Sequence, residues 1–268
     1  MTKIKSWMSK LWQGFEYFKY LIRCFHLHGI HSPFVFELNE SVFKEKIPYY
    51  SFDEIEAVRA KLLLTNKEIK VEDFGAGSAK LKTDTRKISK IAQHSLKSPK
   101  KAQLIYRLVH RFQPNTILEI GTSLGITTAY MSKARPQAMI ISLEGSPEIA
   151  KVASVNFRKL NTLNIKSVVG RFEETLSSAL QELEHADFVF FDGNHQKNPT
   201  LDYFHSCLKY ANENSIFVFD DIHWSKEMNQ AWQEIKRNER VTVTIDCFEM
   251  GIVFFKKDQE KEHFTVYH

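Results

Sequence analysis

Cysteine is scarce in this sequence, which has only Cys24, Cys207 and Cys247 among 268 residues. An odd number of widely spaced cysteines offers neither a disulfide framework nor the paired spacing of a zinc site. Such sparse cysteines are typical of a reducing compartment. No apolar run is long enough to span a bilayer. The first residues, MTKIKSWMSKLWQGFEYF, also lack the apolar core and small-residue cleavage site of a signal peptide. These absences predict a cytoplasmic protein.

Acidic residues are scarce in the first part of the chain. Residues 1–113 hold 21 Lys and Arg against 11 Asp and Glu, whereas the remainder holds 16 against 21. A basic front and an acidic back indicate two functional parts. The basic front could face nucleic acid, anionic lipid or an acidic substrate, or it could be an ordinary solvated surface. The charge pattern alone does not decide between these partners.

The first residues have the period of an amphipathic helix over 4–25. Its apolar positions recur three or four residues apart: Ile4, Trp7, Leu11, Phe15, Phe18, Ile22 and Phe25. Such a stripe packs on its own domain or on a second subunit, so a homodimer is one expectation. A basic helix rich in Trp and Phe also suits peripheral contact with a membrane surface.

Up to residue 99 the sequence predicts a helical, basic N-terminal extension that serves as a lid, a substrate-binding region or a dimerisation region. Further helices are expected over 34–46 and 52–66 and near 85–95. Two glycine-containing segments, HGIHSPF (28–34) and DFGAGS (73–78), interrupt the pattern. Each is either a plain turn or part of a lid, since long loops in compact domains are commonly functional.

From residue 100 to 268 apolar strands alternate with helices. The expected strands are 116–120, 138–144, 165–170, 186–192, 215–221, 241–248 and 250–257. Strands separated by helices predict an α/β, doubly wound, mostly parallel sheet. The last two strands are too close for a crossover helix, so we expect a hairpin whose final strand is antiparallel.

The first strand of this domain ends in the glycine turn ILEIGTSLG (117–125). A dinucleotide-binding turn requires G-x-G-x-x-G, but Ser123 and Ile126 stand at its second and third glycine positions. The turn resembles motif I of class I S-adenosylmethionine-dependent methyltransferases, whose fold has a seven-stranded, Rossmann-like sheet. The resemblance implies that S-adenosylmethionine is bound by Glu119, Gly121, Thr122, Ser123 and Gly125, with Glu119 near the methionine amino group.

Further cofactor contacts are expected at the ends of later strands. Glu144 ends the second strand, where a carboxylate can accept hydrogen bonds from both ribose hydroxyls. It could instead serve as an acid at the N-terminus of the next helix. The resemblance implies that Arg171 and Phe172, after the third strand, contact the adenine. Asp192, after the fourth strand, is a further expected cofactor contact.

Carboxylates gather after the fourth and fifth strands, in FDGNH (191–195) and FDDIH (219–223). Because the ends of neighbouring parallel strands meet at one edge, three carboxylates there would repel one another unless a cation intervened. Carboxylate oxygens favour Mg²⁺, Ca²⁺ or Mn²⁺. The sequence therefore predicts a site for a hard divalent cation, such as Mg²⁺.

This arrangement resembles the metal-dependent O-methyltransferases of the catechol and macrocin types. By position, the resemblance implies that Asp192, Asp220 and Asp221 bind the metal and that His195 is the general base. Asn194 departs from the pattern, since an Asp is common there. The implied reaction is O-methylation of a small hydroxylated molecule, phenolic or sugar-like. His223 is a second candidate for the base or a substrate contact.

Two other functions remain open. An RNA methyltransferase could use the basic front to grip nucleic acid, although neither an NPPY-like nor a nucleophilic cysteine motif follows the fourth strand. A non-catalytic methyltransferase-like scaffold could use the front helices for assembly or membrane attachment.

Overall fold

The structure is a computed structural model that describes residues 2–24, 31–73 and 82–268, with the backbone alone for 2–11, 72–73 and 82–83. It divides into two compact units. Unit 1 comprises Met1–Lys44 and Val189–His268, and unit 2 comprises Glu45–Phe188. The expected boundary at residue 99 lies inside unit 2, because the helices that precede it pack against elements that follow it.

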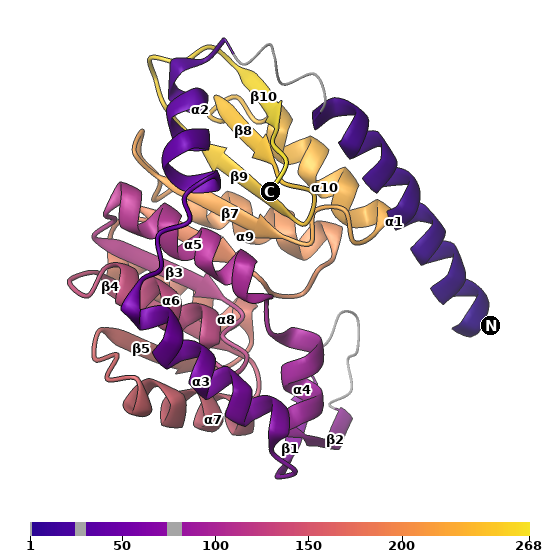
Figure 1. Cartoon of the computed structure of the whole chain (residues 1–268), viewed down its shortest axis with the longest axis vertical. Helices are drawn as coiled ribbons and strands as arrows, with labels where there is room; N and C mark the ends of the chain where they lie inside the picture. Colours follow the sequence, from indigo (N-terminus) through magenta and orange to yellow (C-terminus); the bar gives the residue numbers. More distant parts are fainter. Residues whose placement is uncertain (1, 25–30, 74–81) are drawn as a thin grey trace. The chain divides into compact units, whose positions relative to one another are not determined.

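Unit 2 has both helices and strands. In chain order it carries α3 (Tyr50–Leu64), β1 (Glu68–Asp73), β2 (Lys82–Lys87), α4 (Ile88–Ser95), α5 (Pro99–Phe112), β3 (Thr116–Ile120), α6 (Ile126–Ala134), β4 (Met139–Glu144), α7 (Pro147–Lys159), β5 (Ile165–Val169) and α8 (Phe172–Leu183) (Figure 1). β3, β4 and β5 are parallel neighbours, and their register sets Glu119 opposite Ser142 and Glu144 opposite Val169. The carboxyl ends of β3 and β4 therefore lie together.

Unit 1 contains the two ends of the described chain. It carries α1 (Thr2–Cys24), α2 (Pro33–Leu38), the π-helix η2 (Asn39–Phe43), β6 (Phe188–Phe191, whose first residue belongs to unit 2), α9 (Lys197–Leu208), β7 (Ile216–Asp220), α10 (Lys226–Arg237), β8 (Val243–Asp246), β9 (Met250–Phe254) and β10 (Glu262–Thr265). β9 is antiparallel to both β7 and β8, which confirms the expected hairpin.

The large sheet is mostly parallel, as expected, with the strand order β10-β8-β9-β7-β6-β3-β4-β5. It has eight strands rather than seven. The additional strand, β10, is parallel to β8 at the edge of the sheet. Its residues are half-buried or exposed, and its sequence, EHFT, has no apolar run. An edge strand buries little apolar surface, so it leaves a weak pattern in the sequence.

The front of the chain also contains strands that the sequence did not predict. β1 and β2 form a separate antiparallel hairpin, in register from Glu68 opposite Lys87 to Asp73 opposite Lys82. The expectation that residues 1–99 are helical is therefore wrong for this hairpin, because polar residues in the pattern KTDTRK conceal an exposed strand. The DFGAGS segment falls outside the described residues after Asp73, and so does the HGI of HGIHSPF.

Helix α1 forms where its period predicted, but the buried face differs from the apolar stripe. Glu16, Tyr20 and Cys24 are buried, whereas Phe15 and Phe18 are 56% and 60% exposed. Across the described helices, none is long and apolar enough to cross a membrane. The helix therefore packs through a narrow mixed face and leaves Phe15, Phe18 and Ile22, the described part of its apolar stripe, exposed.

Aromatic rings fill the cores of both units. In unit 1, Phe191 and Phe219 stack with ring centroids 4.2 Å apart. In unit 2, Phe52 of α3 contacts Tyr106 of α5 and Tyr130 of α6, at centroid distances of 4.9 and 5.4 Å. These contacts hold α3 against α5 and α6.

Gly251 of β9 offers a test of core packing in unit 1. A Cβ atom there would lie 2.7 Å from two ring atoms of Trp232, which is buried. Gly251→Ala should therefore lower the free energy of unfolding by about 1–3 kcal/mol, the usual cost of overpacking. Urea unfolding measures the difference.

The matched control is Gly14→Ala in α1, where no atom lies within 4 Å of the added Cβ. It should stabilise the helix by up to about 1 kcal/mol, because alanine loses less backbone entropy than glycine. Equal effects of the two substitutions would contradict this account of the Trp232 contact.

Candidate functional site

The turn after β3 has several positive φ angles, a backbone conformation that favours glycine. Gly121 and Gly125 have φ angles of 106° and 78°, and Ser123 has 49°. The backbone N–H groups of Gly121 and Thr122 both donate to the carbonyl of Leu143 in β4, at 3.0 Å. The turn is therefore fixed to the neighbouring strand before α6 begins.

Gly125 has a packing role as well as a conformational one. A Cβ atom there would lie 2.5 Å from the ring of Phe157 in α7 and 3.1 Å from Cβ of Ala153. The side-chain amide of Asn156, also in α7, donates to the carbonyl of Leu124 at 2.9 Å. The close approach that requires glycine is thus the packing of α7 against the turn.

Glu119 is wholly buried at the end of β3. Its Oε2 accepts hydrogen bonds from the hydroxyls of Thr128 in α6 and Ser142 in β4, both at 2.5 Å. Since the Ser142 hydroxyl donates to Glu119, it accepts from Thr122 Oγ1, also at 2.5 Å. This carboxylate therefore anchors the turn, β4 and α6 together, and its contact with a methionine amino group stays a prediction.

Glu144, at the end of β4, also supports the turn. Its Oε2 accepts from the backbone N–H of Ser123 at 2.8 Å, and its Oε1 accepts from that of Ser146, ahead of α7, at 2.9 Å. Burial raises the pKa of Glu144, although these backbone donors oppose the shift. The backbone N–H of Gly145 is also hydrogen-bonded to this carboxylate, so of its roughly four acceptor positions about one remains for a ligand.

The two adenine candidates lie where β5 leads into α8. Gly170 has a φ of 151°, and Arg171 precedes Phe172, the first residue of α8. Arg171 is more than half exposed and its guanidinium lies 3.7 Å from the carboxylate of Glu173. Phe172 is partly exposed. Both side chains are therefore accessible to a ligand, and their contact with adenine stays a prediction.

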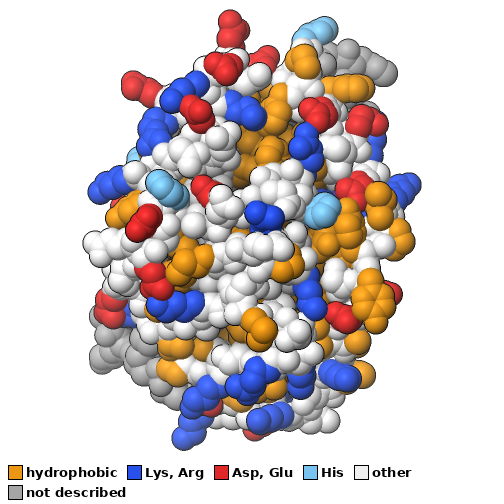
Figure 2. Space-filling model, turned by 90° about the vertical axis from the view of Figure 1, so that its left-hand side faces the viewer, with side chains coloured by type: hydrophobic (Ala, Val, Ile, Leu, Met, Phe, Trp, Pro, Cys, Tyr) orange, Lys and Arg blue, Asp and Glu red, His pale blue; other side chains and the backbone are white. Residues whose placement is uncertain are grey.

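A basic segment adjoins the turn in unit 2. The exposed lysines of α3, β1, β2 and α4 include Lys61, Lys70, Lys87 and Lys90. α4 ends at Ser95, whose hydroxyl is hydrogen-bonded to that of Ser123 at 2.7 Å. Figure 2 shows that Lys and Arg side chains gather at the lower edge of one face of the molecule. The Ser95 contact was not expected, since nothing in the sequence links these two serines.

Asp192, His195 and Asp220 form a cluster in unit 1. Asp192 follows β6, and Asp220 is the last residue of β7 and is 2% exposed. One potential ligand atom from each residue lies within 4.8 Å of the others. His195 Nε2 is 3.7 Å from Asp192 Oδ1. Three residues from the two predicted segments, 191–195 and 219–223, are therefore brought together.

Asp221 lies on the other side of the same histidine ring. Its Oδ2 is 3.7 Å from His195 Nδ1, and its φ angle of 55° turns the chain directly after β7. Asn194 also has a positive φ, of 65°, and its side-chain amide donates to the hydroxyl of Tyr203 at 3.3 Å. Its Oδ1 is buried with no hydrogen-bond partner among the described atoms. Asp221 thus adds a further carboxylate beside the imidazole of the cluster.

His223 has a different environment from His195. It is 4% exposed, its Nε2 is 2.8 Å from Asp246 Oδ2, and its Nδ1 accepts from the side-chain amide of Asn229 at 2.8 Å. Its ring also stacks on Phe248. With both nitrogens engaged, His223 fixes the segment after β7 to β8 and α10, and it is not positioned as a base. Sequence reasoning missed its partners, which lie on other elements.

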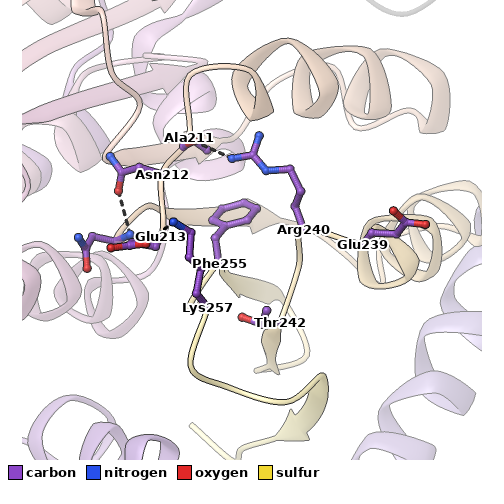
Figure 3. Close-up of a pocket in the computed structure, with 9 residues that line it drawn as sticks. Ala211, Asn212, Glu213, Glu239, Arg240, Thr242, Phe255 and Lys257 are labelled. Carbon is purple, nitrogen blue, oxygen red and sulfur yellow. Dashed lines mark hydrogen bonds and ion pairs between the residues drawn. The ribbon is translucent and has the colours of Figure 1, made fainter.

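Unit 1 also has a pocket of about 690 Å³, shown in Figure 3, at the opposite end of β7 from Asp220. It is lined by 211–214, which precede β7, and by Phe255 and Lys257, which follow β9. The guanidinium of Arg240 donates to main-chain carbonyls of Leu208 and Ala211. Lys257 Nζ pairs with a carboxylate oxygen of Glu213 at 2.7 Å. These charged groups tie loops together, and no predicted site residue lines the pocket.

Comparison with known proteins agrees with this geometry. Residues 118–222 match the family model of a methyltransferase domain. The catechol O-methyltransferase of Niastella koreensis is 28% identical over 128 residues, which cover 47% of this chain and 57% of the relative. That of Mycobacterium tuberculosis is 26% identical over 153 residues, covering 56% and 66%. The chain thus spans less than two thirds of the length of these relatives.

Among solved structures, the O-methyltransferase from Bacillus cereus in complex with SAH has a similar fold. The TM-score is 0.55 at 16% sequence identity, and the match covers 81% of this chain and 95% of that chain. Residues 118–222 therefore resemble a methyltransferase domain, the related sequences are O-methyltransferases, and the fold is similar to that of a solved O-methyltransferase.

Proposed function

We propose that the protein is an S-adenosylmethionine-dependent O-methyltransferase that acts on a small hydroxylated molecule with the help of a divalent cation. The observation that carries this proposal is the cluster of Asp192, His195 and Asp220, which follows two strand ends in a chain with a methyltransferase domain. Carboxylates beside an imidazole suit the deprotonation of a hydroxyl group more than they suit simple binding.

The turn residues fit the cofactor. Glu144 offers a carboxylate with remaining acceptor capacity at the end of β4, which suits a hydrogen bond from a ribose hydroxyl. Gly121, which has a positive φ angle, carries no side chain that would obstruct the approach of a ligand to the turn. Arg171 and Phe172 would hold the adenine. When bound, S-adenosylmethionine supplies an electrophilic methyl group.

The donor set of unit 1 fits a hard cation. Asp192 and Asp220 would hold it, with Asp221 as the expected third ligand, and Mg²⁺ is the ion that this oxygen set favours. Such an ion lowers the pKa of a bound hydroxyl. Asp192 would thus both bind the cation and contact the cofactor. His195, held between Asp192 and Asp221, would accept the hydroxyl proton at one of its ring nitrogens.

The acceptor is proposed to be phenolic or sugar-like, and the catechol O-methyltransferase relatives favour a catechol as the first probe. The Ser95–Ser123 contact, which brings the basic segment to the turn, is compatible with an anionic acceptor, including RNA. The motif FDGNH after β6 is neither NPPY-like nor a nucleophilic cysteine motif, so we prefer the small molecule.

Glu144→Gln should weaken the binding of S-adenosylhomocysteine by about tenfold to a hundredfold at neutral pH, since hydrogen bonds to a charged group contribute about 1.5–3 kcal/mol. Burial raises the pKa of Glu144, so its ionised, ligand-accepting form is lost as the pH falls through that raised value. Affinity for the wild type should therefore decrease towards acid pH. Calorimetric titration measures both effects.

The glutamine variant should lose this pH dependence, because its amide does not titrate. The matched control is Glu148→Gln, which changes an ion-paired residue of α7 and should bind as the wild type does. Unchanged binding by Glu144→Gln would remove the ribose role.

The raised pKa of Glu144 also affects the stability of the protein without its ligand. The contribution of Glu144 to the free energy of unfolding is greatest at low pH and decreases as the pH rises through the raised pKa.

Mn²⁺, as a probe for the cation, should bind to the wild type and raise its melting temperature. Asp220→Asn should reduce the affinity at least about tenfold, because it removes a buried negative ligand without changing size. Calorimetry with Mn²⁺ alone makes the measurement independent of the acceptor. Asp202→Asn, an exposed acid on α9, is the control. Equal Mn²⁺ affinities for the two variants would exclude the proposed site.

His195→Gln should lower the rate of methyl transfer from S-adenosylmethionine to a dihydroxybenzoate by about 10²–10⁴-fold, the usual contribution of a general base. Its affinity for S-adenosylhomocysteine should not change, since the histidine does not belong to the turn. Transfer of a labelled methyl group measures the rate, and His205→Gln on α9 is the control. A rate within twofold of the wild type would show that another group takes the proton.

A further inference from the structure

Helix α1 has two faces with different surroundings. Along its inner face, Glu16, Tyr20 and Cys24 are 4–6% exposed. The hydroxyl of Tyr20 donates to the carbonyl of Val266 at 2.7 Å, and its ring lies 5.4 Å from that of Phe248. The helix is therefore attached to unit 1 through this face, and it lies along one side of that unit (Figure 1).

The opposite face is apolar and exposed. Phe15, Phe18 and Ile22 lie three and four residues apart, with exposed fractions of 56%, 60% and 46%. Single exposed apolar residues are common on proteins, but a row of them on one helical face marks an interaction surface. We call these three residues the outer stripe. In the sequence, the same spacing continues through Ile4, Trp7 and Leu11.

The charge of α1 is almost entirely of one sign. The helix contains five basic residues: Lys3, Lys5, Lys10, Lys19 and Arg23. Its single acid, Glu16, is buried on the inner face, and Lys19 Nζ pairs with it at 2.9 Å. Lys19 Nζ also lies 4.2 Å from the ring centre of Phe15. The sequence of α1 therefore has a net charge of +4, five basic residues less one acid, and Lys19 and Arg23 are the basic residues whose side chains the structure describes.

These features select the occupant of the outer stripe. In a second copy, the same stripe would be accompanied by the same basic residues, so pairing two helices would set like charges against each other. An anionic lipid surface instead complements the charge, and its interfacial region accepts Phe and Trp side chains. We propose that α1 is an interfacial helix that binds the protein to anionic membranes through the outer stripe.

The helix would lie in the plane of the membrane surface. Each stripe side chain would transfer its exposed area from water to the acyl boundary, while the basic side chains remain at the headgroups. No described helix could span the bilayer, so this attachment is peripheral and reversible. Its strength should fall with rising ionic strength, because salt screens the lipid charge.

Flotation of the full-length protein with vesicles tests the proposal. Vesicles of phosphatidylcholine mixed with phosphatidylglycerol should bind the wild type, whereas phosphatidylcholine vesicles should bind it much less. The triple variant Phe15→Ser, Phe18→Ser, Ile22→Ser should lose at least about tenfold in partitioning, given the apolar area removed. The matched control, Leu64→Ser with Leu163→Ser, changes residues that are 81% and 86% exposed elsewhere and should bind normally.

Circular dichroism and binding of S-adenosylhomocysteine should be equal in all variants, which separates membrane attachment from folding and from the proposed enzymatic function. Flotation of the triple variant like the wild type would overturn the proposal, and so would equal binding to both kinds of vesicle. Absence of flotation, combined with a dimer in sedimentation that the triple variant dissociates, would identify a second copy as the occupant instead.

Discussion

Carboxylates buried at the ends of β-strands must find hydrogen-bond donors, and the architecture around the proposed cofactor turn depends on how they do so. An isolated buried carboxylate costs several kcal/mol, a large part of a domain's net stability. Glu119 meets this requirement with hydroxyl groups from β4 and α6. Glu144 meets it with the backbone N–H groups of Ser123, in the turn after β3, and of Ser146, ahead of α7. The donors come from the turn and its neighbours, so satisfying the charge also fixes the turn.

The acids of unit 1 follow a different pattern. His195 stands 3.7 Å from carboxylate oxygens of both Asp192 and Asp221, which is longer than a hydrogen bond. A turn held by short hydrogen bonds is preorganised for a ligand of fixed shape, whereas the imidazole of His195 lies beyond hydrogen-bonding distance of these two carboxylate oxygens. The first arrangement suits binding of a cofactor, and the second suits a cation and a proton transfer.

The sequence predicted the parts of the fold where burial and spacing agree. Apolar runs ending in Glu119, Glu144 and Asp220 identified the strands, and a parallel topology predicts that the carboxyl ends of such strands share one edge of a sheet. The pattern failed where burial is partial. β10 and the β1–β2 hairpin have polar or half-buried residues, so their sequences do not alternate clearly. Partners distant in sequence, such as Ser95 with Ser123 and Asp246 with His223, leave no pattern in a single chain.

Helix α1 shows why periodicity identifies an apolar face without identifying what covers it. Hydrophobic burial is non-directional, so a stripe of Phe and Ile is equally suited to a core, a second subunit or a lipid surface. Tyr20 and Cys24 are less conspicuous in the sequence, yet they hold the helix, because the tyrosine hydroxyl reaches a specific carbonyl on Val266. A side chain with an apolar body and a polar tip can thus determine orientation. Once that face is assigned, the apolar stripe opposite it must be explained by something outside the unit.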